Sequence, residues 1–268
     1  MNDKISETVL ITGASSGIGL ELARCFAADY FSGSGCRVIL VARNSPALEK
    51  LAEELRREYE VQATVLTADL SLPESPKKIF SELQAANLHV DVLVNNAGFG
   101  LHGKFMELDL RRQMEMIQVN VAALTELTRR FLPGMIRCQR GGILNVGSVA
   151  GFVPGPNMAV YFATKAFVQS FTEALAEELA GTGVTVTALC PGPTATNFSQ
   201  VARGQRTPKF QASKMSAETV ARYGHRAFRR GKVVAVPGFG NRFLIFSTRI
   251  ASRRQVRKAV KSLNKIKE

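Results

Sequence analysis

The sequence contains no tryptophan, and only four cysteines and three histidines occur among its 268 residues. The cysteines (Cys25, Cys36, Cys138 and Cys190) form no CxxC pair, and the histidines form no HExxH motif. These absences argue against a zinc site and against a disulfide framework. We therefore expect four reduced, mostly buried thiols and no bound metal.

Long hydrophobic runs are also missing. No stretch approaches the roughly 18 apolar residues of a membrane-spanning helix, and residues 1–8 lack the apolar segment of a signal peptide. Hydrophobic residues make up 46% of the chain and charged residues 21%, which excludes disordered and collagen-like classes. A chain of this length can bury about three quarters of its surface without disulfides or a metal. We expect a cytoplasmic protein.

The net charge of +13 is concentrated at the C-terminal end of the chain. Residues 242–268 contain nine Lys or Arg and one acid, so they carry +8 and leave +5 for the other 241 residues. A strongly basic surface can bind nucleic acid or an anionic membrane. Because no nucleic-acid-binding motif accompanies the basic tail, no nucleic-acid partner is expected.

Short β-branched runs alternate with longer helical patterns over the first 240 residues. Most runs are continuously apolar, which is typical of a parallel sheet covered on both faces. Strands are expected at 8–12, 37–41, 63–67, 90–95, 142–146, 184–189 and 232–236, and helices at 18–28, 47–59, 76–86, 110–137, 158–180 and 217–230. The alternation predicts one α/β domain over 1–241, with a doubly wound, parallel seven-stranded sheet in an α/β/α sandwich. A basic extension, 242–268, follows.

The helical pattern around Asn120 has a clear period. Apolar residues follow one another at steps of three, four or seven, which predicts a single apolar helix face. These residues are Met106, Leu110, Met114, Ile117, Val121, Leu124 and Phe131.

The first expected strand leads directly into Thr12-Gly13-Ala14-Ser15-Ser16-Gly17-Ile18-Gly19, which opens a helix. Such a turn needs glycines for positive φ and close backbone approach, and it directs free N–H groups at a phosphate. No Lys-Ser/Thr pair follows the glycines, which excludes a Walker A loop, and the spacing differs from GxGxxG. The position at the first strand and first helix favours a phosphate-binding turn over an ordinary one.

Further motifs follow in order: Asn95-Asn96-Ala97-Gly98, Asn120, Ser148, Tyr161 with Lys165 four positions later, and Pro191-Gly192. Together with the TGxxxGIG turn, this set resembles the short-chain dehydrogenase/reductase superfamily over residues 8–240. The resemblance implies a Rossmann-type fold and an oxidoreductase that binds a nicotinamide dinucleotide across the carboxyl ends of the strands.

The resemblance also implies which residues contact the cofactor. Asp69 would contact the adenine, with Leu70 beside it, although an acid that caps the following helix is the alternative. The segment after the sixth strand would contact the nicotinamide end. The full expected set is Gly13, Ser15, Ser16, Gly17, Ile18, Gly19, Arg43, Asp69, Leu70, Asn96, Ala97, Gly98, Tyr161, Lys165, Pro191, Gly192, Thr194 and Thr196.

The end of the second strand indicates which dinucleotide is bound. An NAD enzyme places an acid there for the ribose 2′-OH, whereas this chain has Ala42 followed by Arg43. A guanidinium can hold a 2′-phosphate by two hydrogen bonds. Such a charged hydrogen bond contributes about 1.5–3 kcal/mol, or roughly 10- to 150-fold in affinity. We therefore predict NADP(H). The alternative is that Arg43 is a solvated loop charge that contacts no cofactor. The link over 29–35, which leads into the second strand, is longer than is usual in the family.

Tyr161 and Lys165 share one helix face because they are four residues apart. Lowering a tyrosine pKa from about 10 by about 3 units needs about 4 kcal/mol, which an ammonium at about 4–5 Å supplies at an effective dielectric near 20. The resemblance implies that Tyr161 is the general acid/base and that Lys165 lowers its pKa and binds the nicotinamide ribose. It also implies that Ser148 stabilises the substrate oxygen and Asn120 holds a water. A purely structural Asn120 is the alternative.

The resemblance places a substrate lid at 193–216. Apolar side chains occur there and in two other segments, and they predict a pocket without an obvious charged anchor, although Arg203 or Lys209 could reach into it. The expected substrate is a hydrophobic ketone, a secondary alcohol or a 3-oxoacyl/lipid-like carbonyl; ordinary core packing is the alternative for these side chains. They are Phe99, Leu101, Phe105, Phe152, Val153, Met158, Phe198, Val201, Phe210 and Met215.

Alternative functions remain open at this point. The same fold could serve as a catalytically silent NADP(H)-binding sensor or scaffold, although the intact set of Asn120, Ser148, Tyr161 and Lys165 argues against silence. The resemblance implies a homodimer or homotetramer formed by the helices that carry Asn120 and Tyr161.

The tail over 242–268 allows three interpretations: a solvated basic helix, a peripheral membrane contact, or a subunit or nucleic-acid contact. Phe243, Phe246 and Ile250 form one apolar set, and a second set begins at Val256. Because the step between the two sets is six, one continuous amphipathic helix is not expected.

Overall fold

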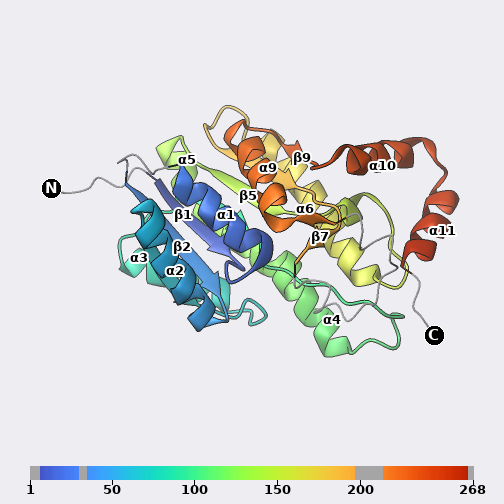
Figure 1. Cartoon of the computed structure of the whole chain (residues 1–268), viewed down its shortest axis with the longest axis horizontal. Coiled ribbons are helices and arrows are strands. Elements are labelled where there is room, and N and C mark those ends of the chain that lie inside the picture. Colours follow the sequence, from blue (N-terminus) through green and yellow to red (C-terminus); the bar gives the residue numbers. More distant parts are fainter. Residues whose placement is uncertain (1–6, 30–34, 197–213, 265–268) are drawn as a thin grey trace.

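A seven-stranded parallel sheet forms the centre of the molecule (Figure 1). The computed structural model describes residues 7–29, 35–196 and 214–264. The strand order is β3-β2-β1-β4-β5-β6-β9, and every neighbouring pair is parallel. The strands are β1 Glu7–Thr12, β2 Cys36–Ala42, β3 Gln62–Thr67, β4 Val92–Asn95, β5 Gly142–Val146, β6 Thr185–Leu189 and β9 Val234–Ala235. The predicted fold class and the seven predicted strand positions are confirmed.

Helices cover both faces of the sheet (Figure 1). On one face lie α1 Gly17–Ala28, α2 Ser45–Tyr59 and α9 Ala217–Arg229. On the other face lie α3 Ser75–Ala85, α5 Leu124–Cys138 and α6 Ala159–Glu178. Successive side chains of β1 point to opposite faces of the sheet. Val9 and Ile11 pack against the helices of the first face, and Leu10 packs against the helices of the other face. A strand that is buried on both sides explains the continuous apolar run in the sequence.

The predicted helix over 110–137 is interrupted by a π-helix. α4 covers Leu110–Ile117, the π-helix covers Gln118–Ala123, and α5 continues from Leu124. A π-turn accommodates one extra residue, so the apolar rows before and after it point in different directions. The prediction of a single apolar face is therefore wrong. Leu124 and Phe131 are buried, whereas Met106, Leu110, Met114 and Ile117 are exposed.

The tail folds as two helices, α10 Phe239–Ile250 and α11 Arg253–Leu263. Ser252 separates them and caps α11, since its hydroxyl accepts from the Gln255 backbone and the Gln255 side chain accepts from the Ser252 backbone. The expectation that no continuous helix spans the tail is confirmed. Among the described residues, no helix is long and apolar enough to cross a membrane.

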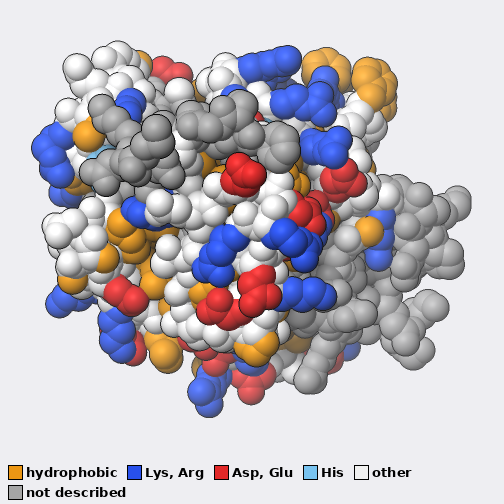
Figure 2. Space-filling model, turned by 60° about the vertical axis from the view of Figure 1, so that its left-hand side comes forward, with side chains coloured by type: hydrophobic (Ala, Val, Ile, Leu, Met, Phe, Trp, Pro, Cys, Tyr) orange, Lys and Arg blue, Asp and Glu red, His pale blue; other side chains and the backbone are white. Residues whose placement is uncertain are grey.

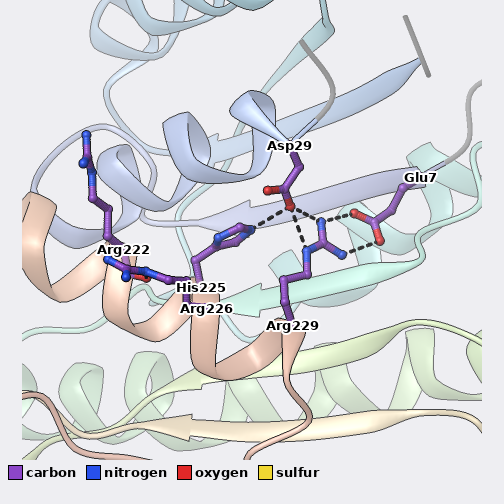
Figure 3. Close-up of polar contacts among 6 residues, drawn as sticks. All are labelled: Glu7, Asp29, Arg222, His225, Arg226 and Arg229. Atoms are coloured by element: carbon purple, nitrogen blue, oxygen red, sulfur yellow. Dashed lines mark hydrogen bonds and ion pairs between the residues drawn. The ribbon is translucent and has the colours of Figure 1, made fainter. Parts of the chain in front are cut away.

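An ion-pair cluster ties α9 to α1 and β1 at the amino ends of the strands (Figure 3). The Arg229 guanidinium donates to both carboxylate oxygens of Glu7, at 2.8 and 2.7 Å, and to Asp29 at 2.8 Å. His225 Nε2 lies 2.8 Å from the same Asp29 oxygen. Arg229 also stacks on Phe26, 5.0 Å from its ring centroid. Burial alone would raise the pKa of Asp29, but His225 and Arg229 hold it below its ordinary value.

We expect Arg229→Ala to lower the free energy of unfolding by about 1–3 kcal/mol, because two partly buried carboxylates lose their cation. Urea unfolding measures this difference. Arg226→Ala is the matched control: Arg226 is exposed on the same helix and, among the described residues, its one hydrogen bond is to the Arg222 carbonyl, so its loss stays within about 0.5 kcal/mol. Equal effects of the two substitutions would contradict the stabilising role of the cluster.

Candidate active site

The glycine-rich turn after β1 is shaped by close backbone contacts. Gly13 has φ +66°, and a Cβ atom there would lie 2.8 Å from Asn96 Nδ2 and 2.9 Å from Ala97 Cα. A Cβ at Gly19 would overlap the same Asn96 nitrogen. Ser16, at the N-cap of α1, makes no side-chain capping hydrogen bond. The first N–H groups of α1 therefore face the crevice without a capping side chain, as a phosphate requires.

The segment Asn96–Gly98 is held against this turn by hydrogen bonds. The Thr12 hydroxyl accepts from the backbone N–H groups of Asn96 and Ala97, both at 3.0 Å. Asn96 Nδ2 donates to the carbonyls of Thr12 at 2.8 Å and Gly13 at 3.1 Å. The ends of β1 and β4 are thus joined at the carboxyl edge of the sheet, where a dinucleotide fold binds its ligand.

Asn120 lies in the π-helix and is buried, with 1% of its surface exposed. Its side-chain amide donates to the Phe99 carbonyl at 2.9 Å and to the Thr164 hydroxyl at 3.1 Å, and its oxygen accepts from the Phe99 N–H at 3.1 Å. The side chain therefore fixes the backbone that follows Gly98. These are the contacts expected of a structural Asn120, and its water-holding role stays a prediction.

Ser148, Tyr161 and Lys165 come from β5 and α6. Ser148 follows β5 and caps the 3₁₀-helix Val149–Phe152, since its hydroxyl accepts from the Ala150 N–H. Tyr161 and Lys165 are one turn apart on α6, and Lys165 Nζ lies 6.0 Å from the centroid of the Tyr161 ring. A Cβ at Gly98 would lie 3.6 Å from Lys165 Nζ and 3.0 Å from Asn120 Oδ1. The four predicted catalytic residues thus belong to elements that meet at one edge of the sheet.

Lys165 is a buried cation. Only 6% of its surface is exposed, and its ammonium donates to the Val146 carbonyl at 2.7 Å. Burial penalises the charged form and lowers the pKa of Lys165 to about 8. The neighbouring Cys190 is also buried, which raises the pKa of its thiol to about 12. Lys165 therefore changes its charge close to neutral pH, whereas the Cys190 thiol stays protonated there.

Arg43 and Asp69 follow the ends of the neighbouring strands β2 and β3. The Arg43 guanidinium is exposed and lies 3.8 Å from an Asp69 carboxylate oxygen. Asp69 also accepts from the backbone and hydroxyl of Ser71, at 2.9 and 2.8 Å. Burial alone would raise the pKa of Asp69, but these hydrogen bonds and Arg43 hold it below its ordinary value. An exposed guanidinium at this edge can reach a cofactor phosphate.

The segment after β6 crosses the crevice from the opposite side. Thr194 donates to the Gly192 carbonyl at 3.0 Å, and the strand β7 Thr194–Ala195 pairs with β8 Met215–Ser216. A Cβ at Gly17 would lie 3.0 Å from the Thr196 methyl group. The predicted nicotinamide-side and phosphate-side residues therefore meet over the N-terminus of α1. Phe198, Val201, Arg203, Lys209 and Phe210 of the predicted lid lie outside the described residues.

The predicted apolar wall divides between two places. Phe99, Leu101 and Met158 pack around Tyr161. Phe152 and Val153 instead line a separate groove of about 490 Å³ with Ala159, Phe162, Ala163 and Ala166. The helical period places these α6 residues opposite Tyr161 and Lys165. Phe105 is largely exposed.

Known proteins resemble this chain in sequence and in fold. The sequence profile of the short chain dehydrogenase family matches residues 7–207. The chain belongs to the short-chain dehydrogenase/reductase family. Sulfoacetaldehyde reductase 2 of Chromohalobacter salexigens is 41% identical over 202 residues, which are 75% of this chain and 77% of that protein. The NADP-dependent 3-hydroxy acid dehydrogenase of Schizosaccharomyces pombe is 35% identical over 215 residues, which are 80% and 79% of the two proteins.

A short-chain dehydrogenase from Sphingobium yanoikuyae, solved in complex with NADPH, shares the fold with a TM-score of 0.80 at 33% identity. The match covers 91% of this chain and 93% of that chain. The NADPH-bound structure and the NADP-dependent relative agree with the cofactor predicted from Ala42 and Arg43. The prediction of an oxidoreductase of this family is confirmed.

A buried polar ladder in the elements that carry the predicted catalytic residues was not anticipated from the sequence. Asn95 Nδ2 donates to Asn145 Oδ1 at 2.9 Å and to the Thr128 hydroxyl at 3.1 Å, and Asn145 Nδ2 donates to the Thr172 hydroxyl at 2.9 Å. The ladder links β4, β5, α5 and α6. A signal was present in the sequence, because Asn95 and Asn145 are polar residues near the ends of apolar strand runs.

The lowered pKa of Lys165 predicts a pH dependence. Below about pH 8 the side chain is an ammonium, and above it the side chain is a neutral amine that can no longer support Tyr161 electrostatically. We expect kcat/KM for NADPH, which reports on groups of the free enzyme, to fall as pH rises through about 8. Lys165→Arg keeps its charge at all these pH values, so this descending limb should be absent from its profile. A wild-type profile without that limb would contradict the prediction.

Proposed function

We propose that the protein is an NADP(H)-dependent reductase that converts a hydrophobic ketone or 3-oxoacyl/lipid-like carbonyl to a secondary alcohol. The observation that carries this proposal is the placement of Ser148, Tyr161 and the buried Lys165 beside an apolar wall. The reverse reaction uses the same groups. The relatives' names include a small sulfonated aldehyde and 3-hydroxy acids as substrates, so the apolar side chains around Tyr161, rather than those two names, support the substrate class.

The residues of this chain fit a dinucleotide. The glycine turn leaves no room for a Cβ at Gly13. The Ser16 side chain does not cap the N-terminus of α1, and Arg43 lies at the same edge of the sheet. We assign the phosphates to the turn, the adenosine 2′-phosphate to Arg43 and the nicotinamide ribose to Lys165. When bound, NADPH supplies the hydride that is added to the carbonyl carbon.

Proton transfer and charge stabilisation fall to the protein. Ser148 donates a hydrogen bond to the substrate oxygen and stabilises the negative charge that develops there. Tyr161 gives its phenolic proton to the same oxygen, and the Lys165 ammonium stabilises the resulting phenolate. Phe99, Leu101 and Met158 exclude water from this side of Tyr161 and favour an apolar substituent on the substrate. Asn120 positions the Phe99 backbone.

We also propose that two copies associate through the α4–α6 region. Met106, Leu110 and Met114 are 87%, 69% and 56% exposed, and Phe167 of α6 is partly exposed beside a groove of about 850 Å³. The charges over residues 104–117 are balanced, because Lys104, Arg111 and Arg112 are matched by Glu107, Asp109 and Glu115, and both arginines pair with Glu115. An apolar, nearly neutral surface suits a self-complementary interface. Sedimentation velocity of the wild-type chain without lipid measures this assembly.

Replacement of Tyr161 tests the reductase. We expect NADPH consumption with the best substrate of a panel of diketones, steroids and 3-oxoacyl thioesters to fall by at least about 100-fold in Tyr161→Phe, because the proton donor is lost. Tyr59→Phe, on α2 across the sheet, should retain full turnover. NADPH binding without turnover of any panel member would favour the silent sensor instead.

Replacement of Arg43 tests the cofactor assignment. We expect Arg43→Glu to weaken NADPH binding by about 10- to 150-fold, because the carboxylate repels the 2′-phosphate, while NADH binding changes far less. Arg37→Glu makes the same charge change at the other end of β2, where Arg37 contacts Gln62, and should leave both affinities unchanged. Equal losses for NADPH and NADH in Arg43→Glu would contradict the assignment.

A further inference from the structure

The helix α10 exposes a row of large apolar side chains. Phe239, Phe243, Phe246 and Ile250 follow one another at steps of four, three and four, so they lie on one face. They are 82%, 64%, 57% and 76% exposed. A row of aromatic and aliphatic side chains of this kind, which we name the α10 stripe, is costly to leave in water.

The opposite face of α10 holds the helix on the protein. Asn241, Ile245 and Thr248 lie roughly half a turn from the stripe and are only partly exposed. Asn241 donates to the Pro237 carbonyl at 2.7 Å and would contact a Cβ at Gly192. Figure 1 shows α10 and α11 as outlying elements at one end of the molecule. The stripe therefore points away from the body on a helix whose orientation is fixed.

The surroundings of the α10 stripe are strongly basic. Residues 239–264 contain seven arginines and lysines and no acid. Arg242 and Arg249 lie on α10, and Arg253, Arg254, Arg257, Lys258 and Lys261 lie on α11. Among the described residues none of the seven forms a salt bridge. By contrast, Figure 2 shows a face of the body on which Lys and Arg alternate with Asp and Glu.

We propose that the α10 stripe inserts into the interface of an anionic lipid bilayer, with the cations of α10 and α11 that do not contact the body reaching the lipid headgroups. Arg242 is not one of these, because it donates to Tyr223 and to the Val236 carbonyl, and neither are Arg253 and Arg257, which line the groove beside α6. An apolar helix face beside clustered cations is the surface that binds anionic membranes, since apolar burial and charge attraction add. A second copy fits this surface poorly. In a symmetric pair the same patch meets itself, and seven cations would face seven cations with no acid between them.

Seating α10 on a membrane also orients the active site. The Asn264 carbonyl, directly after α11, accepts from Asn157 Nδ2 at 2.8 Å and lies 3.1 Å from His102 Nε2. Asn264 Nδ2 donates to the Pro156 carbonyl at 3.2 Å. These contacts tie the tail to the loops that precede Tyr161 and follow Gly98. A tail bound to lipid is therefore held directly to those two loops, and delivery of an apolar carbonyl substrate from the lipid along this route rests on the proposed function.

The absence of tryptophan allows a direct test on the full chain. Phe243→Trp introduces a single reporter within the stripe. We expect its emission to shift to the blue when equimolar phosphatidylglycerol/phosphatidylcholine vesicles are added, and to stay unchanged with phosphatidylcholine alone. Cosedimentation with the anionic vesicles should weaken at high salt, because the headgroup attraction is screened.

Two variants with the same charge change separate insertion from electrostatics. Phe243→Glu breaks the stripe, whereas Leu244→Glu places the same carboxylate about 100° around the helix. We expect Phe243→Glu to weaken vesicle binding at least about tenfold more than Leu244→Glu, with NADPH turnover in solution unchanged in both. That readout keeps the test independent of the catalytic proposal.

Three results would overturn the membrane proposal. The first is no cosedimentation of the wild-type chain with the anionic vesicles. The second is an equal loss of binding in Phe243→Glu and Leu244→Glu, which would leave only a general charge effect. The third is a reporter that is already blue-shifted without lipid, together with a fall in mass for Phe243→Glu, which would show that a second copy covers the stripe.

Discussion

The hydrogen bonds between Thr12 and the Asn96–Ala97 backbone join the carboxyl ends of β1 and β4, and the architecture of the site depends on this junction. It brings the glycine turn within van der Waals reach of the next strand's end, so that only glycine fits at Gly13. The uncapped end of α1 then faces the crevice. The place that we propose for the cofactor phosphates therefore depends on one contact between two strands.

A second constraint lies in the strands and helices that carry the predicted catalytic residues. The amides of Asn95 and Asn145 are fully buried, and they link β4 and β5 to the hydroxyls of Thr128 and Thr172. Hydrogen bonds in such surroundings are strong and hold the two strands and two helices in one arrangement, although the Asn95 side-chain oxygen is buried without a partner among the described residues. The same low dielectric that strengthens this ladder also lowers the pKa of Lys165. Rigidity and a lysine poised near neutral pH therefore have a common physical origin.

Two exposed apolar surfaces distinguish this molecule, and their charges separate them. The segment 104–117 around α4 contains three cations and three acids, so a second copy can approach without a net charge. The α10 stripe lies among cations that have no acidic partner within residues 239–264. Hydrophobic exposure alone would not assign either surface, because both sets of side chains are equally unfavourable in water. The charges around each apolar surface therefore decide whether we propose a protein or a lipid as its partner.

The sequence by itself determined the fold class, the strand positions and the family, because apolar runs, glycine spacing and the Tyr161–Lys165 pair are local properties of the chain. It also predicted the break between α10 and α11 from one irregular step. Tertiary structure alone decided the rest. The π-turn at Asn120 divided a helix face that looked continuous, Phe152 and Val153 turned to the far side of α6, and Thr196 came to lie against Gly17. These outcomes depend on packing between distant segments, which periodicity within one segment does not encode.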